Sequence, residues 1–164
     1  MSFVGSYLWR LRQQVGSELV LMPGAMVALQ RQDGQVLLAK RRDSGVWCLP
    51  AGGAEVGGSF ATAAVSELAE ETGVEVSPAD LVPFACLSEA ELHTVSYPNG
   101  DVTHCFALCF LARRWRGEPQ ADMDEMTAVR FAPLDQLPAP LDPPAAQALA
   151  LLEAYLAAGK FQVR

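Results

Sequence analysis

The segment SELAEETGV, residues 66–74, concentrates three carboxylates at the end of an expected helix. Glu67, Glu70 and Glu71 are three and four residues apart, so in a helix their side chains lie on one side. Like charges at these spacings destabilise a helix, and anions near its C-terminus oppose the helix dipole. A bound cation would offset both penalties, and hard divalent cations such as Mg²⁺ prefer carboxylate oxygens. The segment therefore predicts a metal site.

A glycine-rich loop, PAGGAEVGG at residues 50–58, directly precedes this helix. Ser59 is the expected N-cap and Gly73 the expected C-terminal stop, so we predict a helix over residues 61–71. Such a loop lets backbone amides and carbonyls approach a ligand closely. Loop and helix together predict a binding site.

Strand-like segments lie on both sides of this loop and helix. We expect strands at residues 18–31, 35–42, 47–49, 81–88, 92–97, 102–112 and 129–131, with further helices at residues 3–15 and 143–158. Asp33-Gly34 predicts a hairpin between the first two strands. This order predicts an α/β (α+β) fold, an α/β/α sandwich with a mixed β-sheet between helices. We expect residues 1–164 to form a single domain.

Composition narrows the partners and the compartment. With 12 Lys and Arg against 19 Asp and Glu, the net charge is −7, which disfavours nucleic acid as a partner. No apolar run reaches the roughly 20 residues that span a bilayer, and no export signal is visible, so we expect a cytoplasmic protein without a membrane partner. Cys48, Cys86, Cys105 and Cys109 should be reduced thiols. A zinc site with His104 is disfavoured, because a strand directs His104 away from Cys105 and Cys109.

Residues 52–74 resemble the Nudix box, the signature of the Nudix (MutT-like) hydrolase family. Its pattern is Gly, five residues, Glu, seven residues, Arg-Glu, an aliphatic residue, any residue, Glu-Glu, any residue, Gly and an aliphatic residue. The segments WCLPAGG before the box and EMTAVRFAPLDQLP after it also look like the family's, so the resemblance spans most of the chain. The box positions that match are Gly52, Glu67, Leu68, Glu70, Glu71, Gly73 and Val74.

Two positions depart from the pattern. Gly58 stands where the family has its first Glu, and Ser66 where it has Arg. In the family these two side chains typically pair and support the box. Losing both residues leaves no partly buried charge without its partner. The change therefore looks like the joint loss of a supporting ion pair. Glu55, three residues earlier, is the alternative candidate for the missing glutamate's role.

The resemblance implies a Nudix-type pyrophosphatase: a metal-dependent hydrolase that cleaves a phosphoanhydride bond in a nucleoside diphosphate linked to another group. The expected metal is Mg²⁺, with Mn²⁺ as an alternative. By position, Glu67, Glu70 and Glu71 match the metal-binding glutamates, and the Ala51 carbonyl matches a loop ligand. Glu67 is also a candidate general base. So is Glu125, which matches an acidic loop position of the family unless it is simply an exposed loop charge.

Candidates for substrate binding are less distinct. Arg41 and Arg42 suit bidentate phosphate contacts, with solvent exposure at a strand end as the alternative. Tyr97 either lines the rim of the pocket or covers its hairpin, and Trp47 favours a core role over stacking on a base. The rival hypothesis is a non-catalytic Nudix-like domain that binds a nucleotide or a protein. A homodimer through the N-terminal helix or a sheet edge is a further expectation.

Overall fold

The computed structural model describes residues 4–97 and 99–164. Among these residues, no helix combines the length and the apolar composition that crossing a bilayer requires. The helices are α1 (Tyr7–Val15), α2 (Phe60–Thr72), α3 (Ala90–His93) and α4 (Pro143–Ala158), with one 3-10 turn, η1 (Pro78–Asp80). The strands are β1 (Val20–Leu29), β2 (Val36–Arg41), β3 (Trp47–Cys48), β4 (Ala51–Gly53), β5 (Val82–Leu87), β6 (Thr94–Ser96), β7 (Val102–Ala112), β8 (Met126–Ala132) and β9 (Gln162–Val163).

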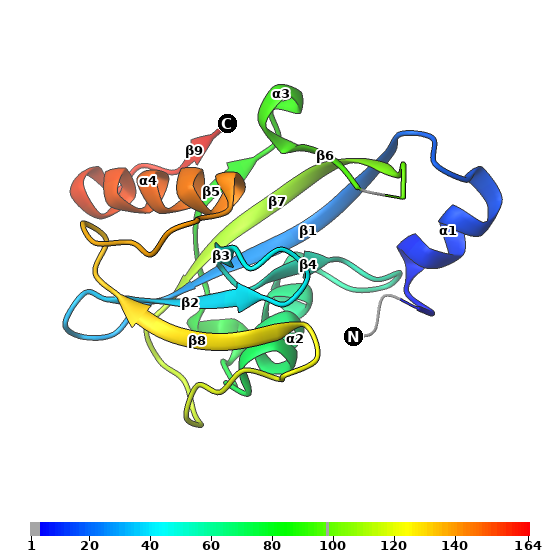
Figure 1. Ribbon diagram of the computed structural model, residues 1–164. Helices are drawn as coiled ribbons and strands as arrows, with labels where there is room; N and C mark the ends of the chain where they lie inside the picture. Colours follow the sequence, from blue (N-terminus) through cyan, green and yellow to red (C-terminus); the bar gives the residue numbers. More distant parts are fainter. Residues whose placement is uncertain (1–3, 98) are drawn as a thin grey trace.

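The strands form two sheets. The larger, mixed sheet has the order β4-β1-β7-β5-β9, with β6 also paired to β7, and the smaller antiparallel sheet has the order β3-β2-β8. Strand β1 runs parallel to β7 from Val20 opposite Thr103 to Leu29 opposite Ala112, and β4 pairs with its other edge. Figure 1 shows β1 and β7 side by side, with β2 and β8 below them.

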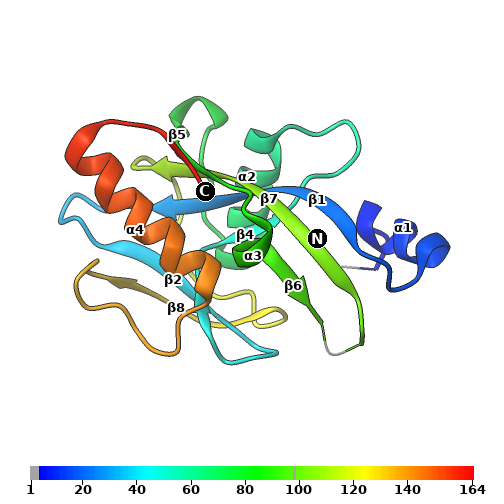
Figure 2. The ribbon, with the colours of Figure 1, turned by 90° about the horizontal axis from the view of Figure 1, so that it is seen from above.

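The two long helices cover opposite faces of β1. Met26 and Ala28 belong to the core on the side of α4, whereas Ala25, Val27 and Leu29 belong to the core on the side of α2. Successive side chains of a strand point to opposite faces, so an unbroken apolar run contributes to both cores. Figures 1 and 2 show α4 and α2 on either side of the strands. The predicted α/β/α sandwich with a mixed sheet is confirmed.

The Asp33-Gly34 turn does not close the predicted hairpin. The turn itself forms, and Gly34 has the positive φ, 85°, that such a turn favours. Apart from one bridge between Gln30 and Val36, however, β1 and β2 separate into different sheets. The predicted pairing is wrong, because β1 pairs along its length with β7 and at residues 24–26 with β4, whereas β2 pairs with β3 and β8.

The predicted glycine-rich loop is also partly a strand. Residues 51–53 form β4, which pairs antiparallel with β1. Residues 54–58 then form the connection to α2, here called the pre-helix loop. The two glycines of β4 therefore belong to the sheet edge, where Gly52 faces Glu67 of α2 and Gly53 faces Met22 of β1.

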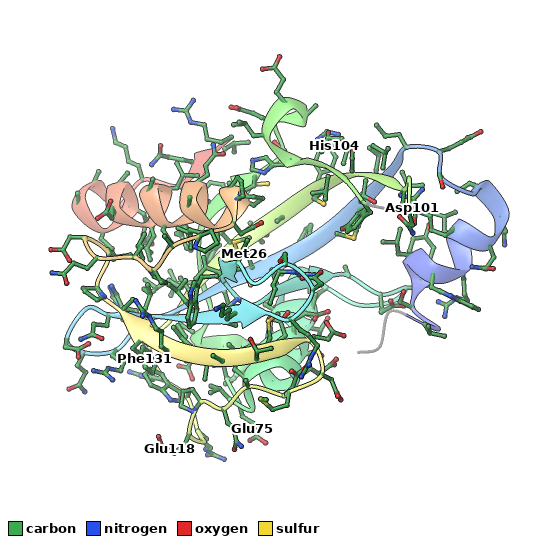
Figure 3. The ribbon with its side chains drawn as sticks, viewed as in Figure 1. Met26, Glu75, Asp101, His104, Glu118 and Phe131 are labelled. Atoms are coloured by element: carbon green, nitrogen blue, oxygen red, sulfur yellow. The ribbon has the colours of Figure 1, made fainter. Side chains whose placement is uncertain are left out.

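The cysteines are unpaired, as predicted. Cys48 and Cys109 are buried. The His104 ring, labelled in Figure 3, donates from Nε2 to the Ser88 carbonyl at 2.8 Å and lies 4.5 Å from the Phe106 ring. These contacts give His104 a structural role in the sheet.

A buried arginine attaches helix α1 to the sheet. The Arg12 guanidinium donates to the Val102 carbonyl at 2.6 Å and to the Thr103 hydroxyl at 2.9 Å, both on β7. It also donates to the Glu18 carbonyl and lies 3.6 Å from the Asp101 carboxylate. Figure 3 shows Asp101 close to α1, beside the hairpin of β6 and β7. Because Arg12 is only 7% exposed, these contacts are largely shielded from water.

We expect Arg12→Ala to release α1 from the sheet. Removing one partner of a buried ionic contact costs about 3 kcal/mol or more, because the other groups stay buried without it. Amide hydrogen exchange over residues 7–15 should accelerate at least tenfold. Gln13→Ala is the control, since Gln13 is exposed on the same helix. Unchanged exchange in the Arg12 variant would show that other contacts hold α1.

Candidate functional site

Helix α2 has the predicted caps, Ser59 and Gly73, and is one residue longer at each end than the predicted 61–71. Ser59 and Thr62 form a capping box, in which the Thr62 amide donates to the Ser59 hydroxyl at 3.1 Å and the Ser59 amide donates to the Thr62 hydroxyl at 2.7 Å. Gly73 ends the helix in the left-handed conformation, with φ 68°. The fully buried Leu68 fixes which side of the helix faces the sheet.

The Glu67 side chain lies directly on the glycine backbone of β4. A Cβ atom at Gly52 would be 2.1–2.6 Å from the carboxyl carbon and oxygens of Glu67, which is closer than any side chain tolerates. Gly24 on β1 is equally crowded, because a Cβ there would lie 2.5 Å from the Gly52 carbonyl oxygen. Gly52 therefore leaves room for the Glu67 carboxylate against β4, and Gly24 leaves room for β4 against β1.

Glu71 is a buried carboxylate, 4% exposed. Its Oε2 atom has no hydrogen-bond partner among the described residues. Burial, and then the charge of Glu67, raises the pKa of Glu71 to about 8, although an Ala51 backbone hydrogen bond and the charge of Arg41 oppose the shift. Burial also raises the pKa of Glu67. An unsatisfied buried carboxylate oxygen is costly, and a divalent cation would satisfy it.

Glu125 shares the electrostatic environment of these two glutamates. Its charge contributes to the raised pKa of both Glu67 and Glu71, after the larger effect of burial. Glu70, by contrast, is exposed. Within residues 4–97 and 99–164, no group of three or more His, Cys, Asp or Glu side chains is gathered closely enough to hold a metal ion as it stands. The structure thus brings Glu67 and Glu71 together near Glu125, and places Glu70 on the outer side of the helix.

Asp122 shapes the loop that carries Glu125. Its Oδ1 atom accepts the amides of Asp124, Glu125 and Met126 at 2.8–3.1 Å. The Asp122 amide donates to the Glu71 carbonyl at the end of α2, at 3.3 Å. Asp122 therefore ties the loop to the helix. Asp122 is not among the predicted site residues, although an aspartate just before a turn is a known signal for such side-chain capping.

The candidate substrate-binding arginines have local partners. Arg41 holds Asp43 through two hydrogen bonds, Nε to Oδ1 at 3.0 Å and Nη2 to Oδ2 at 2.7 Å. Arg42 donates from its side chain to the Met123 carbonyl at 2.5 Å and from its amide to the Glu125 carbonyl at 2.8 Å. Arg42 thus supports the same loop as Asp122.

The two aromatic candidates have different surroundings. Tyr97 is 40% exposed, and burial followed by the charge of Cys105 raises its pKa, whereas the charge of Arg41 lowers it. Tyr97 therefore lies within electrostatic reach of Arg41. Trp47 packs against the core on the side of α4, and its ring centroid lies 5.2 Å from the Arg130 guanidinium. This placement confirms the favoured core role of Trp47.

A family model described as the NUDIX domain matches residues 20–152. The chain belongs to the Nudix family. The match covers the β-strands of both sheets up to β8, the carboxylate helix α2 and the first part of α4. Helix α1 precedes the matched residues.

Two curated relatives come from Bacillus subtilis (strain 168). One, provisionally named ADP-ribose pyrophosphatase YjhB, is 30% identical over 112 residues, which are 68% of this chain and 50% of that protein. The other, provisionally named 8-oxo-dGTP diphosphatase, is 46% identical over 50 residues, which are 30% of this chain and 34% of that protein. The aligned parts thus span half or less of these relatives' lengths.

Solved Nudix structures match over most of this chain. A MutT NUDIX hydrolase from Burkholderia pseudomallei is 28% identical, with a TM-score of 0.63 over 81% of this chain and 98% of that one. An ADP-ribose pyrophosphatase from Streptococcus suis is 29% identical, with a TM-score of 0.66 over 87% of this chain and 98% of that one. These matches confirm the MutT-like resemblance of the box and the fold.

The Nudix box departs from the family pattern at Gly58 and Ser66, and the structure shows what surrounds them. A Cβ atom at Gly58 would lie 3.0 Å from the Glu55 carbonyl oxygen and 3.3 Å from Thr62 Oγ1, so the loop is tight there. Ser66 is exposed. The Glu55 carboxylate accepts the Tyr7 amide with both oxygens, at 2.8 and 3.0 Å. Glu55 therefore holds α1, and this role differs from that of the glutamate in the family's supporting ion pair.

We expect Glu71→Gln to stabilise the metal-free protein at alkaline pH. The pKa of about 8 in the folded state lies above the ordinary value of 4.5, so the folded state binds this proton more tightly. The resulting stability is complete below about pH 4.5 and is lost as the pH rises towards 8. Thermal melts in a chelator should therefore show the variant more stable than wild type by several degrees at pH above about 8, since 1 kcal/mol corresponds to about 2–4 °C.

The same variant tests metal binding. Excess Mg²⁺ or Mn²⁺ should raise the melting temperature of wild type, because a ligand of the folded state stabilises it, and should raise that of Glu71→Gln much less. Glu75→Gln is the matched control, since Glu75 is exposed beyond the end of α2, as Figure 3 shows. A Glu71 variant that is less stable than wild type in chelator at alkaline pH would contradict the buried-charge explanation.

We expect Asp122→Ala to loosen the loop at Glu125. The variant leaves three amides without their acceptor, and each such hydrogen bond contributes about 1 kcal/mol. Hydrogen exchange at residues 124–126 should accelerate by at least tenfold, while Asp122→Asn, which keeps an acceptor oxygen, should restore most of the protection. Asp124→Ala serves as the exposed control. Wild-type exchange in Asp122→Ala would show that Arg42 alone supports the loop.

Proposed function

We propose that this Nudix protein is a metal-dependent pyrophosphatase that hydrolyses a phosphoanhydride bond in a nucleoside diphosphate linked to another group. The observation that carries the proposal is the buried Oε2 atom of Glu71, which has no hydrogen-bond partner among the described residues and lies one helical turn from Glu67. A carboxylate packed against a glycine backbone, with a second and buried carboxylate one turn later at the end of the helix, is a poor structural arrangement. The two carboxylates suit a site that binds a cation.

The proposed ligands are the carboxylates of Glu67, Glu70 and Glu71 and the Ala51 carbonyl. Bound Mg²⁺ or Mn²⁺ would neutralise the diphosphate and lower the pKa of a bound water. Glu67 would take the proton from the attacking water, with Glu125 as the alternative base. The raised pKa of Glu67 supports this role, since a base works best with a pKa closer to the working pH.

Arg41 and Tyr97 are proposed to contact the substrate at the same end of the site. The positive charge of Arg41 acts to lower the pKa of Tyr97, and it acts in the same direction on the pKa of Glu71. Arg41 would have to exchange its contact with Asp43 for a phosphate, whereas Arg42 already supports the loop of Glu125. We therefore place more weight on Arg41 than on Arg42 for phosphate binding.

The relatives narrow the class of substrate. Their names include ADP-ribose pyrophosphatase and 8-oxo-dGTP diphosphatase, and both substrates are nucleotides with a phosphoanhydride bond. We propose a substrate of this kind, a single-domain chain and a cytoplasmic location. Homodimerisation through α1 or a sheet edge stays a prediction.

A non-catalytic nucleotide-binding domain is the second candidate. Gly58 and Ser66 favour it, because the charged pair that typically supports the box is absent and Glu55 does not replace it. The exposed position of Glu70 also means that the three glutamates are not yet gathered around one point.

We expect turnover of at least one compound in a panel of ADP-ribose, nucleotide sugars, nucleoside triphosphates and dinucleoside polyphosphates, assayed with Mg²⁺ and Mn²⁺ and with products identified. Glu67→Gln should lower kcat by about 100-fold or more, the usual effect of losing a general base. Glu75→Gln, which changes an exposed glutamate beyond the helix, should keep the wild-type rate. If no compound turns over above background with either metal, the binding domain becomes the better description.

A further inference from the structure

A cavity of about 370 Å³ lies between α1, the pre-helix loop and the first turn of α2. Its size falls within the range of small-molecule sites, about 300–1,000 Å³. Two aromatic side chains line it, Tyr7 from α1 and Phe60 from α2, together with Pro23, Ala54 and Val56. Tyr7 and Phe60 are 38% and 41% exposed, so both keep surface available for contact with a ligand.

Glu55 holds the walls of this cavity together. Its carboxylate accepts the Tyr7 amide and lies 3.6 Å from the Arg10 guanidinium, both on α1. Arg12 attaches the other end of α1 to β7. The helix is thus fixed at both ends, and the charge of Glu55 already has partners within the protein. What the cavity offers a ligand is mainly apolar and aromatic surface.

The unusual glycine of the Nudix box also lines this cavity. Gly58 occupies the position of the family's glutamate, and the cavity wall there consists of backbone alone. Even a Cβ atom would lie 3.0 Å from the Glu55 carbonyl oxygen. Helix α1, which forms the opposite wall, precedes the residues that match the family. Two features that the hydrolytic site does not explain therefore meet at one cavity.

The cavity adjoins the carboxylates. Ala54 lines it, and Gly52, which lies under the Glu67 carboxylate, is two residues earlier, or about 7 Å along an extended chain. Phe60 and Glu67 are two turns apart on the same side of α2, about 10 Å along the axis. The sugar of a nucleotide can bridge this separation.

From this arrangement we infer that the cavity binds the aromatic base of the nucleotide, stacked against Tyr7 and Phe60, while its diphosphate lies at Glu67 and Glu71. The position of the diphosphate rests on the proposed function. Stacking tolerates any base, because every base has a π-face. The cavity should therefore favour a nucleotide over the same sugar phosphate without a base, and discriminate little among the four bases.

Calorimetry with Mg²⁺ tests this without requiring turnover. The four nucleoside monophosphates AMP, GMP, CMP and UMP are compared with ribose 5-phosphate, which lacks the base. Stacking of a base on an aromatic side chain changes affinity by roughly five- to 150-fold. Wild type should thus bind the nucleotides at least about fivefold more tightly than ribose 5-phosphate, and Tyr7→Ala and Phe60→Ala should each remove most of this ratio.

Two further variants sharpen the experiment. Val56→Trp should fill the cavity and abolish the ratio, and because Val56 is 76% exposed the change should leave the melting temperature unaltered. Phe161→Ala is the matched control, since Phe161 is 47% exposed and belongs to the C-terminal end of the chain, outside the cavity lining. If either aromatic variant fails to fold, the affinity ratio of Val56→Trp provides the test of the base site.

Each outcome separates this inference from the proposed hydrolysis. A wild-type protein that binds ribose 5-phosphate as well as the nucleotides, or binds none of the five, overturns the inference even if it hydrolyses a substrate. Folded variants that keep the full ratio also overturn it. A protein that prefers nucleotides to ribose 5-phosphate through Tyr7 and Phe60, but hydrolyses no compound, supports the base site and contradicts the proposed hydrolase function.

Discussion

The contact between the Glu67 carboxylate and the backbone of Gly52 sets the geometry of the whole site. The Glu67 carboxylate occupies the space that a side chain at Gly52 would need, and the close approach of β4 to β1 requires Gly24. A side chain at Gly52 would displace the Glu67 carboxylate, and a side chain at Gly24 would push β4 away from β1. The helix that brings Glu67 to this contact also carries Leu68 into the core and buries the carboxylate of Glu71.

The glutamates lie where a low-dielectric environment makes their charges interact strongly. Glu71 is almost fully buried, and its neighbours within electrostatic reach include both Glu67 and Glu125. The nearby Arg41 is hydrogen-bonded to Asp43, so its charge is already partly compensated. An anionic substrate would meet repulsion here unless a cation came with it. The chemistry of the site and the acidic balance of the chain, −7 overall, are therefore consistent with each other.

Features set by short stretches of sequence could be predicted, and features set by distant contacts could not. The limits of α2 follow from the Ser59 cap and Gly73, and those of α4 from Asp142 and Gly159, because these signals act within one helical turn. The pairing of β1 depends on strands far along the chain, so the hairpin predicted from the local Asp33-Gly34 turn was wrong. Arg12 and Asp122 bond mainly to backbone groups, and such partners are visible only once the fold is known.

The long parallel pairing of β1 with β7 also bears on how the chain acquires its structure during synthesis. The two strands are more than eighty residues apart in sequence, and α2 lies entirely within the interval. The sheet that α2 packs against is therefore incomplete until β7 has left the ribosome. Pairing over such separations is slow, because the loop must close before the contacts form. A nascent chain of this protein accordingly exposes the apolar faces of β1 and α2 together, and during that interval it is most prone to aggregate.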